Sequence, residues 1–352
     1  IDPPIDEARS WLAGRKFSED KPLLDLAQAV PSYPPAEELT DYMAERVKLF
    51  ATAQYGPVSG NAKLKTALAN HMVGVYGGSI QSNNVLISAG CNQAYCLATM
   101  ALAEAGDEII LPVPYYFNHQ MWLEVLGIKA VHLGCNMSQG GLPEIDEARR
   151  LIGKKTKAIV LVTPNNPTGA TYPPDLLQGF FKLCQKHGIK LIIDETYKDF
   201  LTEQPPHQLF EISDWEETLI QVYSFSKCFS LTGYRVGSVI AGENVIESAT
   251  KIMDSVVICA PRIAQDAALY GLEHLTSWVA EKRNMLKKRR ELFNKLFREN
   301  NLGFKIISSG AYFAYVEHQY DNKNAYQVAQ DLLDKENILS LPGTFFGPNQ
   351  ER

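Results

Sequence analysis

Short apolar runs rich in β-branched residues recur along the first two thirds of the chain and alternate with helix-like segments. The runs span residues 84–88, 108–112, 129–133, 158–163, 190–194, 218–224 and 236–241. Between them, residues 93–103 and 173–187 are examples of segments with the length and composition of helices. Strands that alternate with helices are typical of a mostly parallel sheet covered on both faces. The sequence therefore predicts an α/β fold with a seven-stranded sheet.

The length of the chain and a change in its pattern indicate two domains. A single core usually stops growing at about 250–300 residues, and this chain has 352. From about residue 243 onward the pattern changes to long helices, followed by strands at 304–307 and 312–317. Residues 2–14 are predicted to form a helix that packs with this later part. We expect a small α+β domain from residues 1–40 and 246–352, and a large domain from residues 41–245.

Composition narrows the class of protein. Hydrophobic residues make up 45% of the chain and charged residues 21%, as is ordinary for a globular protein. No run of about eighteen apolar residues occurs, so we expect a soluble protein without a membrane span. The formal net charge of −6 argues against a nucleic-acid partner or an anionic membrane surface.

Cysteine usage favours a reducing compartment. The six cysteines show no paired Cys-x-x-Cys spacing, and the first residues lack the basic-then-apolar pattern of a signal peptide. We therefore expect a cytoplasmic protein, and we expect no metal site. Cys91 and Cys228 fall inside the candidate ligand-binding motifs, where we expect small buried residues rather than a catalytic thiol.

The stretch from Ser224 to Gly237 places one amine among hydroxyl groups and follows it with a guanidinium. Lys227 comes directly after Ser226, and Arg235 lies eight residues further along. A lysine can form a Schiff base with an aldehyde, while serine hydroxyls and an arginine can hold a phosphate dianion. This combination indicates pyridoxal 5'-phosphate (PLP). Taken alone, however, Ser-x-Ser-Lys is more often a solvated loop lysine beside turn-forming serines.

Two further segments place suitable groups at strand ends. Asp194 ends a strongly apolar run, so it should emerge at the carboxyl end of a strand, where ligands bind in open α/β sheets. A carboxylate there can keep a pyridine nitrogen protonated, although an Asp that caps the following helix is the alternative. Gly90, Cys91 and Asn92 follow another strand and open a helix, so their backbone N–H groups can point at an anion.

With the segment Thr-Pro-Asn-Asn-Pro-Thr-Gly at residues 163–169, these motifs stand in the order and approximate spacing that a known family uses. From about residue 23 to residue 347 the chain resembles the class I/II aminotransferases of PLP fold type I. That resemblance implies PLP as the cofactor and a homodimer as the active unit. It also implies that Lys227 first holds the aldehyde and then moves a proton between the substrate Cα and the cofactor.

The resemblance assigns roles to the other site residues. It places Asn166 and Tyr197 at the phenolic oxygen of the cofactor, and it matches Tyr116 to the ring that stacks on the cofactor face. A core aromatic is the alternative for Tyr116. The predicted phosphate cup comprises Gly90, Cys91, Asn92, Ser224, Ser226 and Arg235. Tyr55 matches the tyrosine that relatives extend across the dimer interface to the neighbour's phosphate.

Three activities are compatible with these motifs. The leading prediction is transfer of an amino group from an L-amino acid to a 2-oxo acid by a ping-pong route. The alternative is a PLP-dependent C–S lyase or a related carbanion enzyme, because the same residues do not determine which step comes after deprotonation of Cα. A regulatory sensor fused to a DNA-binding head is a distant third, because neither a helix-turn-helix pattern nor a basic cluster precedes the family-like region.

The sequence departs from the family at both ends. Ala29 stands where many relatives have a glycine beside the substrate, and its methyl group should narrow the pocket. Relatives place the arginine that grips the substrate α-carboxylate just beyond the position of Arg352. Truncation is the favoured explanation; the alternatives are that Arg352 takes the role or that the ligand lacks this carboxylate. Arg262 suits packing or surface duty, so specificity for a dicarboxylate is unsupported.

Overall fold

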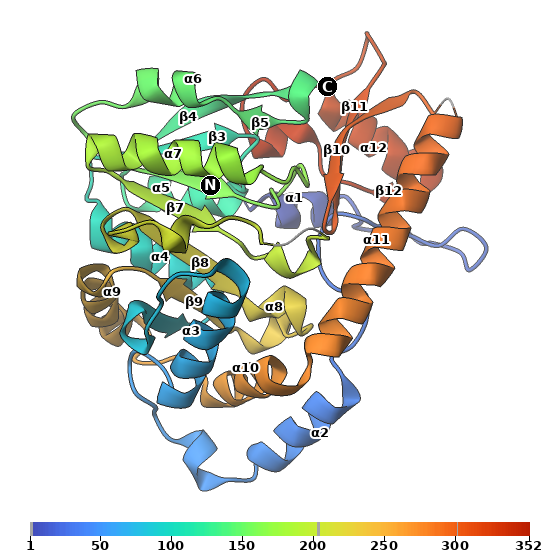
Figure 1. Cartoon of the computed structure of the whole chain (residues 1–352). Coiled ribbons are helices and arrows are strands. Elements are labelled where there is room, and N and C mark those ends of the chain that lie inside the picture. Colours follow the sequence, from blue (N-terminus) through green and yellow to red (C-terminus); the bar gives the residue numbers. More distant parts are fainter. Residues whose placement is uncertain (1–2, 203–204, 301) are drawn as a thin grey trace.

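The fold is built on one large mixed sheet, seen in the computed structural model, which describes residues 3–202, 205–300 and 302–352 (Figure 1). In spatial order the sheet contains β2 (Val85–Ser88), β9 (Gly237–Ile240), β8 (Leu219–Ser224), β7 (Lys190–Asp194), β6 (Thr156–Val162), β3 (Glu108–Val113), β4 (Lys129–Asn136) and β5 (Leu142–Pro143). The pairings from β8 through β4 are parallel, and those of β9 with β2 and β8 are antiparallel. The predicted α/β class is confirmed, and all seven expected strands are present. The eighth strand, β5, has only 2 residues, too few to produce a sequence pattern.

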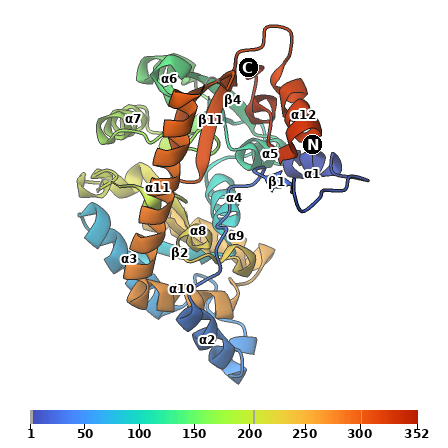
Figure 2. The same ribbon diagram turned by 90° about the vertical axis from the view of Figure 1, so that its right-hand side faces the viewer.

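Helices cover both faces of this sheet, which explains why its strands read as continuous apolar runs. α4 (Cys91–Leu102), α5 (Phe117–Val125) and α9 (Glu243–Val256) lie on one face, and α6 (Ile145–Leu151) and α7 (Pro174–His187) lie on the other (Figure 2). Within β7, Leu191, Ile192 and Ile193 are each 0% exposed. Each such side chain contributes about 1.5–3 kcal/mol when it is fully buried. The central strands therefore form a rigid base for residues that follow them.

The first and last segments of the chain pack against each other. β1 (Leu24–Asp25) pairs in parallel with β12 (Ile338–Leu339), and α1 (Pro4–Ser10) leads into Trp11, whose ring lies 5.0 Å from that of Tyr326 on α12 (Ala325–Glu336). A separate apolar cluster of Ala8, Ala27, Leu333 and Leu339 lies between these elements. The predicted helix at 2–14 is observed as the shorter α1, and Asp2 lies outside the described residues.

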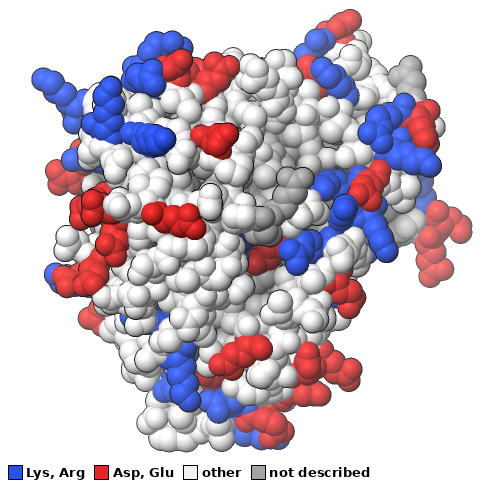
Figure 3. Space-filling model, in the orientation of Figure 1, with Lys and Arg blue, Asp and Glu red and all other residues white. Residues whose placement is uncertain are grey.

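α11 (Thr276–Glu299) and the hairpin of β10 (Phe304–Gly310) and β11 (Phe313–His318) complete this second part of the molecule. No described residue of α11 is fully buried. Ion pairs such as Lys287 with Glu291 and Lys295 with Glu299 run along the helix, and Figure 3 shows mostly basic side chains with fewer acidic ones on this side of the molecule. Part of the charge run at 281–290 is solvated, whereas Arg289 and Arg290 line the cavity described below.

The division into domains follows the two apolar clusters. α9 and α10 (Arg262–His274) belong to the main core through Ala249, Met253 and Ala264, as does α2 (Glu37–Arg46) through Leu39. The sequence predicts that the large domain ends at about residue 245. A helical pattern alone does not show which apolar core a helix joins. We propose a boundary near residue 275 instead. No helix within the described ranges combines the length and apolar character needed to span a bilayer.

Candidate active site

A cavity of about 1570 Å³ opens at the carboxyl ends of the central strands, between the sheet and the β10–β11 hairpin. The predicted site residues that line it are Cys91, Asn92, Tyr116, Asn166, Asp194, Tyr197, Ser224, Ser226, Lys227 and Arg235. Gly90 lies directly behind this lining, at the start of α4. Tyr55 does not line the cavity of its own chain, and 77% of it is exposed. The fold therefore brings together every predicted site residue except Tyr55.

Lys227 lies on α8 (Phe225–Cys228), a single turn that follows β8. Its Nζ donates a hydrogen bond to the backbone carbonyl of Ala29, at 2.8 Å. Burial, and next the positive charge of Arg235, lowers the pKa of Lys227 to about 8. At pH 7 about a tenth of the amine is then neutral, several hundredfold more than for an ordinary lysine. Lys227 is thus an amine that can act as a nucleophile or as a base near neutral pH.

Asp194 is buried at the end of β7, and its charge is stabilised by hydrogen bonds. Its Oδ1 accepts from the backbone N–H of Thr196 at 3.0 Å, and His119 Nε2 lies 3.4 Å from its Oδ2. Burial by itself would raise the pKa of Asp194, but His119 and Thr196 together hold it below the usual value. A carboxylate at the floor of the cavity therefore stays ionised at neutral pH.

His119 is a site residue that sequence reasoning missed. It is buried on α5 and stacks on the ring of Tyr95, with the ring centroids 3.9 Å apart. The available signal was its position three residues after Tyr116, which places both on one side of a helical turn. The aromatic motif at 114–117 predicts a role only for a tyrosine.

Gly90, Ser226 and Arg235 form a cradle for an anion. Gly90 has φ +90°, and a Cβ there would lie 2.2 Å from Nη2 of Arg235, so only glycine lets the guanidinium approach. α4 begins at the next residue and directs its free N–H groups toward the same place. The Oγ of Ser226 is buried without a hydrogen-bond partner within the described residues. A buried hydroxyl beside a guanidinium and a helix N-terminus fits a phosphate group.

Ser224 has a different part in this cradle. Its Oγ accepts a hydrogen bond from the backbone N–H of Ser226 at 3.1 Å and so caps α8. Cys91, the first residue of α4, is buried with its Sγ 3.7 Å from Oδ1 of Asp194. Burial raises the pKa of the Cys91 and Cys228 thiols, so both stay protonated.

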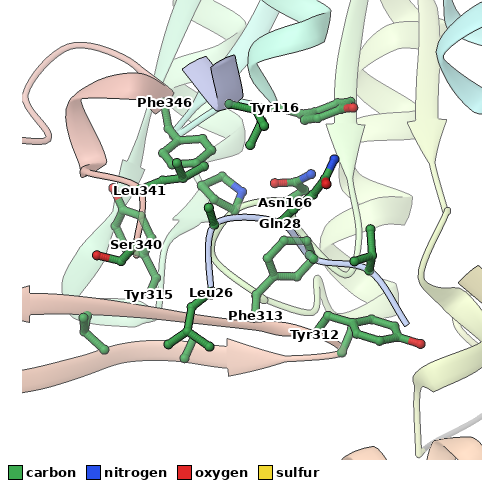
Figure 4. Close-up of a pocket in the computed structure, with 18 of the residues that line it drawn as sticks. Leu26, Gln28, Tyr116, Asn166, Tyr312, Phe313, Tyr315, Ser340, Leu341 and Phe346 are labelled. Carbon is green, nitrogen blue, oxygen red and sulfur yellow. The ribbon is translucent and has the colours of Figure 1, made fainter. Parts of the chain in front are cut away.

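Aromatic and amide groups surround the space between Lys227 and Asp194. The hydroxyl of Tyr116 donates to Oδ1 of Asn92 at 3.2 Å, and Tyr197 packs edge-on against Phe313. Burial raises the pKa of Tyr116 and of Tyr197, so each hydroxyl keeps its proton. Asn166 also lines the cavity and is labelled in the close-up of Figure 4.

The opposite wall of the cavity is largely apolar. Figure 4 shows that it includes Leu26, Tyr312, Phe313, Tyr315, Leu341 and Phe346. The hydroxyl of Tyr312 is held by that of Tyr33, at 2.6 Å. Because these side chains come from β10–β11 and from both ends of the chain, sequence reasoning did not group them.

Two arginines considered for carboxylate binding have other partners. Arg352 lies at the edge of the cavity, and its Nη2 forms an ion pair with Asp321 at 2.6 Å. Arg262 begins α10 and packs beside Gly56, where an added Cβ would lie 3.6 Å from its side chain. Neither contact indicates that Arg352 or Arg262 binds a substrate carboxylate.

Known proteins share the sequence pattern of nearly the whole chain. Residues 21–352 match the family model described as aminotransferase class I and II. The chain belongs to this family. It is 31% identical to the aspartate aminotransferase of Pyrococcus horikoshii over 296 aligned residues. This alignment covers 83% of this chain and 75% of that protein. It is also 28% identical to the aromatic aminotransferase ISS1 of Arabidopsis thaliana, over 92% of this chain and 82% of that one.

The solved structures agree with the family assignment. The structure of the aspartate aminotransferase from Thermus thermophilus with maleate matches with a TM-score of 0.89 and 26% identity, over 98% of this chain and 90% of that one. The predictions of the fold, the family and an aminotransferase are thereby confirmed. The roles of individual residues stay predictions, which the geometry of the cavity makes specific.

Proposed function

We propose that this aminotransferase binds PLP in the described cavity and moves an amino group from an L-amino acid to a 2-oxo acid by a ping-pong route. The observation that carries this proposal is the pairing of Lys227, whose pKa is about 8, with the buried carboxylate of Asp194 in one cavity. The cradle of Gly90, Ser226 and Arg235 adds a place for the phosphate. When bound, PLP supplies an electron sink for the electron pair released as the substrate Cα–H bond breaks.

The protein's own groups divide the remaining work. Asp194 would hold a proton on the cofactor's ring nitrogen, because its ionised carboxylate is a strong acceptor. Lys227 would hold the aldehyde carbon in the resting enzyme, and its freed amine would take the proton from the substrate Cα and deliver it to the cofactor carbon. Asn166 and Tyr197 offer an amide and a hydroxyl to the phenolic oxygen, and Tyr116 covers one side of the space. Leu26, Phe313, Leu341 and Phe346 in the apolar wall add no competing proton donor or acceptor.

The same wall supports a proposal for the substrate class. Its lining of Leu26, Tyr312, Phe313 and Phe346 offers apolar area to a substrate side chain (Figure 4), while Arg9, Arg289 and Arg290 line other parts of the same cavity. An aspartate side chain packed against these four residues would lose its water and gain no charged partner from them, at a cost of several kcal/mol. We therefore propose aromatic and large aliphatic L-amino acids as donors. Relatives are named as aspartate and as aromatic aminotransferases, so the names leave both classes open.

An absorbance screen tests the function and the substrate class together. We expect Phe, Tyr, Leu or Met to convert the visible spectrum of the bound cofactor, and a 2-oxo acid to reverse the change. Asp should act at least about tenfold more slowly, since one unpaired buried charge accounts for more than 1.4 kcal/mol. Conversion by Asp and Glu alone would contradict the apolar substrate class.

The screen also separates the competing activities. Release of pyruvate and ammonia without any 2-oxo acid would favour the C–S lyase. A bound cofactor that none of the twenty L-amino acids converts would favour the regulatory sensor. Absence of any cofactor band in the purified chain would contradict the proposed role of Lys227. The cytoplasmic location rests on the sequence alone and would be tested by cell fractionation.

We also propose a homodimer in which Tyr55 reaches the partner's cavity. The proposal is supported by exposed apolar side chains at Val47, Phe50, Tyr55 and Ile258, with Phe50 79% exposed. We expect sedimentation at twice the chain mass of 39.2 kDa, so a monomer at micromolar concentration would contradict the dimer. Mixing inactive Lys227→Ala subunits with impaired Tyr55→Ala subunits should restore about a quarter of wild-type activity. Random pairing makes half of the dimers hybrid, and each hybrid has one intact site.

A further inference from the structure

A buried polar cluster lies behind α8, on the side away from the cavity. It comprises Lys198, Asp199, Tyr223 and Cys228, with His71 at its edge. The side chains of Lys198 and Asp199 are only 2% and 12% exposed, and Tyr223 and Cys228 are each 1% exposed. The proposed transamination mechanism uses none of these groups.

The cluster is a continuous chain of contacts. Lys198 Nζ donates to Oδ1 of Asp199 at 2.8 Å, and the Tyr223 hydroxyl lies 2.7 Å from Oδ2 of Asp199. The same hydroxyl lies 3.1 Å from Sγ of Cys228. A phenol has one proton, and the carboxylate is the stronger acceptor, so that proton goes to Asp199. The thiol then rests against a phenol oxygen that the carboxylate holds in place.

His71 completes the surroundings of the ion pair. Its Nε2 lies 3.4 Å from Lys198 Nζ, and burial, followed by the charge of Lys198, lowers the pKa of His71 to about 4. At neutral pH the imidazole is therefore uncharged and adds no charge to the pair. The ammonium of Lys198 also lies 4.7 Å from the ring centroid of Tyr223, which further fixes that ring.

The positions of these residues in the sequence connect the cluster to the active site. Lys198 and Asp199 directly follow Tyr197, and Cys228 directly follows Lys227. The cluster thus links the segment that carries Tyr197 to the turn that carries Lys227. A buried ion pair adds little net stability compared with apolar groups of similar size, so stability alone does not account for this one.

We propose that Asp199 is a positioning residue for Lys227, which it holds in register by fixing the Tyr223 hydroxyl against Cys228 at the base of the α8 turn. The inference rests on the proposed role of Lys227 in binding PLP. In this arrangement the positive charge of Lys198 balances the negative charge of the buried Asp199 carboxylate. The four-residue α8 has few backbone hydrogen bonds of its own, so a side-chain contact at Cys228 has a large influence on where Lys227 points.

Tyr223→Phe is the first test, because it removes the hydroxyl and keeps the ring. In the holoenzyme we expect kcat to fall roughly tenfold with the KM for the amino donor nearly unchanged, as expected for a misplaced reacting group. The pH midpoint of the visible absorbance of bound PLP should rise by about half a unit or more, because a looser turn lets water stabilise the protonated nitrogen of Lys227. Asp199→Asn should shift the same two quantities in the same direction.

Tyr76→Phe is the matched control. Tyr76 is likewise a fully buried tyrosine whose hydroxyl donates to a buried carboxylate, that of Glu195 at 2.8 Å. Its other hydrogen-bond and ring partners are Gln221, His207 and Phe210, which lie outside α8. The Tyr76→Phe variant should lower the melting temperature to a similar extent while the absorbance midpoint stays at the wild-type value. If Tyr223→Phe and Asp199→Asn lose stability but keep the wild-type midpoint and kcat, the cluster is only structural and the proposal is wrong. A wild-type protein without any cofactor band would instead contradict the proposed function itself.

Discussion

Replacing Lys227 with alanine should lower kcat for transamination by about ten-thousand-fold or more. The substitution removes the amine that is proposed to hold the aldehyde and also the base that moves the Cα proton, so two contributions are lost together. No other lysine lines the cavity within the described part of the chain. The measurement is kcat with a saturating amino donor, together with the visible spectrum of the protein after incubation with PLP.

Lys65→Ala provides a matched control for the first result. Lys65 is also partly buried with a pKa lowered by burial, but its Nζ donates to Oγ of Ser59 outside the cavity. This variant should keep near-normal kcat and the wild-type spectrum. Transamination by Lys227→Ala at a rate close to wild type would end the proposed mechanism, whatever the stability of the variant.

Asp194→Asn is expected to reduce kcat by about two to three orders of magnitude. The amide has the same size as the carboxylate but carries no charge, so the ring nitrogen of the cofactor loses the partner that keeps it protonated. The negative charge of Asp194 raises the pKa of Lys227, opposing the larger effects of burial and Arg235. Its removal should therefore move the pKa of Lys227 further down.

The conservative variant distinguishes charge from packing. Asp194→Glu keeps the carboxylate and should recover part of the lost kcat, whereas Asp194→Asn should not. Both variants need a melting curve, because the site is buried and because Asp194→Asn replaces one of the two carboxylate oxygens that His119 and Thr196 contact. If Asp194→Asn retained kcat within about tenfold of wild type, the proposed role at the ring nitrogen would fail.

The features that the sequence predicted are those with a local pattern. A parallel strand covered on both faces reads as a continuous apolar run, so β7 and the position of Asp194 at its end could be inferred directly. Lys227 and Arg235 stand close together on the chain and form a recognisable motif. Gly90 was identified by its place between a strand and a helix, and its φ of +90° explains why glycine is needed there.

The features that sequence reasoning missed depend on tertiary contact. His119 reaches Asp194 from a helix 75 residues earlier in the chain, and no spacing rule relates the two. The carbonyl of Ala29, which accepts from Lys227, has no side-chain signal at all. The boundary that we propose near residue 275 differs from the expected one near 246 because α9 contributes to the main apolar cluster. To predict any of these three features, one would need to know which helices and strands pack against each other.

The pairing of β1 with β12 has a consequence for the order in which the site is made during translation. Leu24 is synthesised long before its partner Ile338, so this parallel ladder cannot form until Ile338 has emerged from the ribosome. The anion cradle and Lys227 all come from the segment between Gly90 and Arg235. The half of the cavity that carries the chemistry is therefore synthesised before Leu341 and Phe346, which complete the wall facing the substrate side chain.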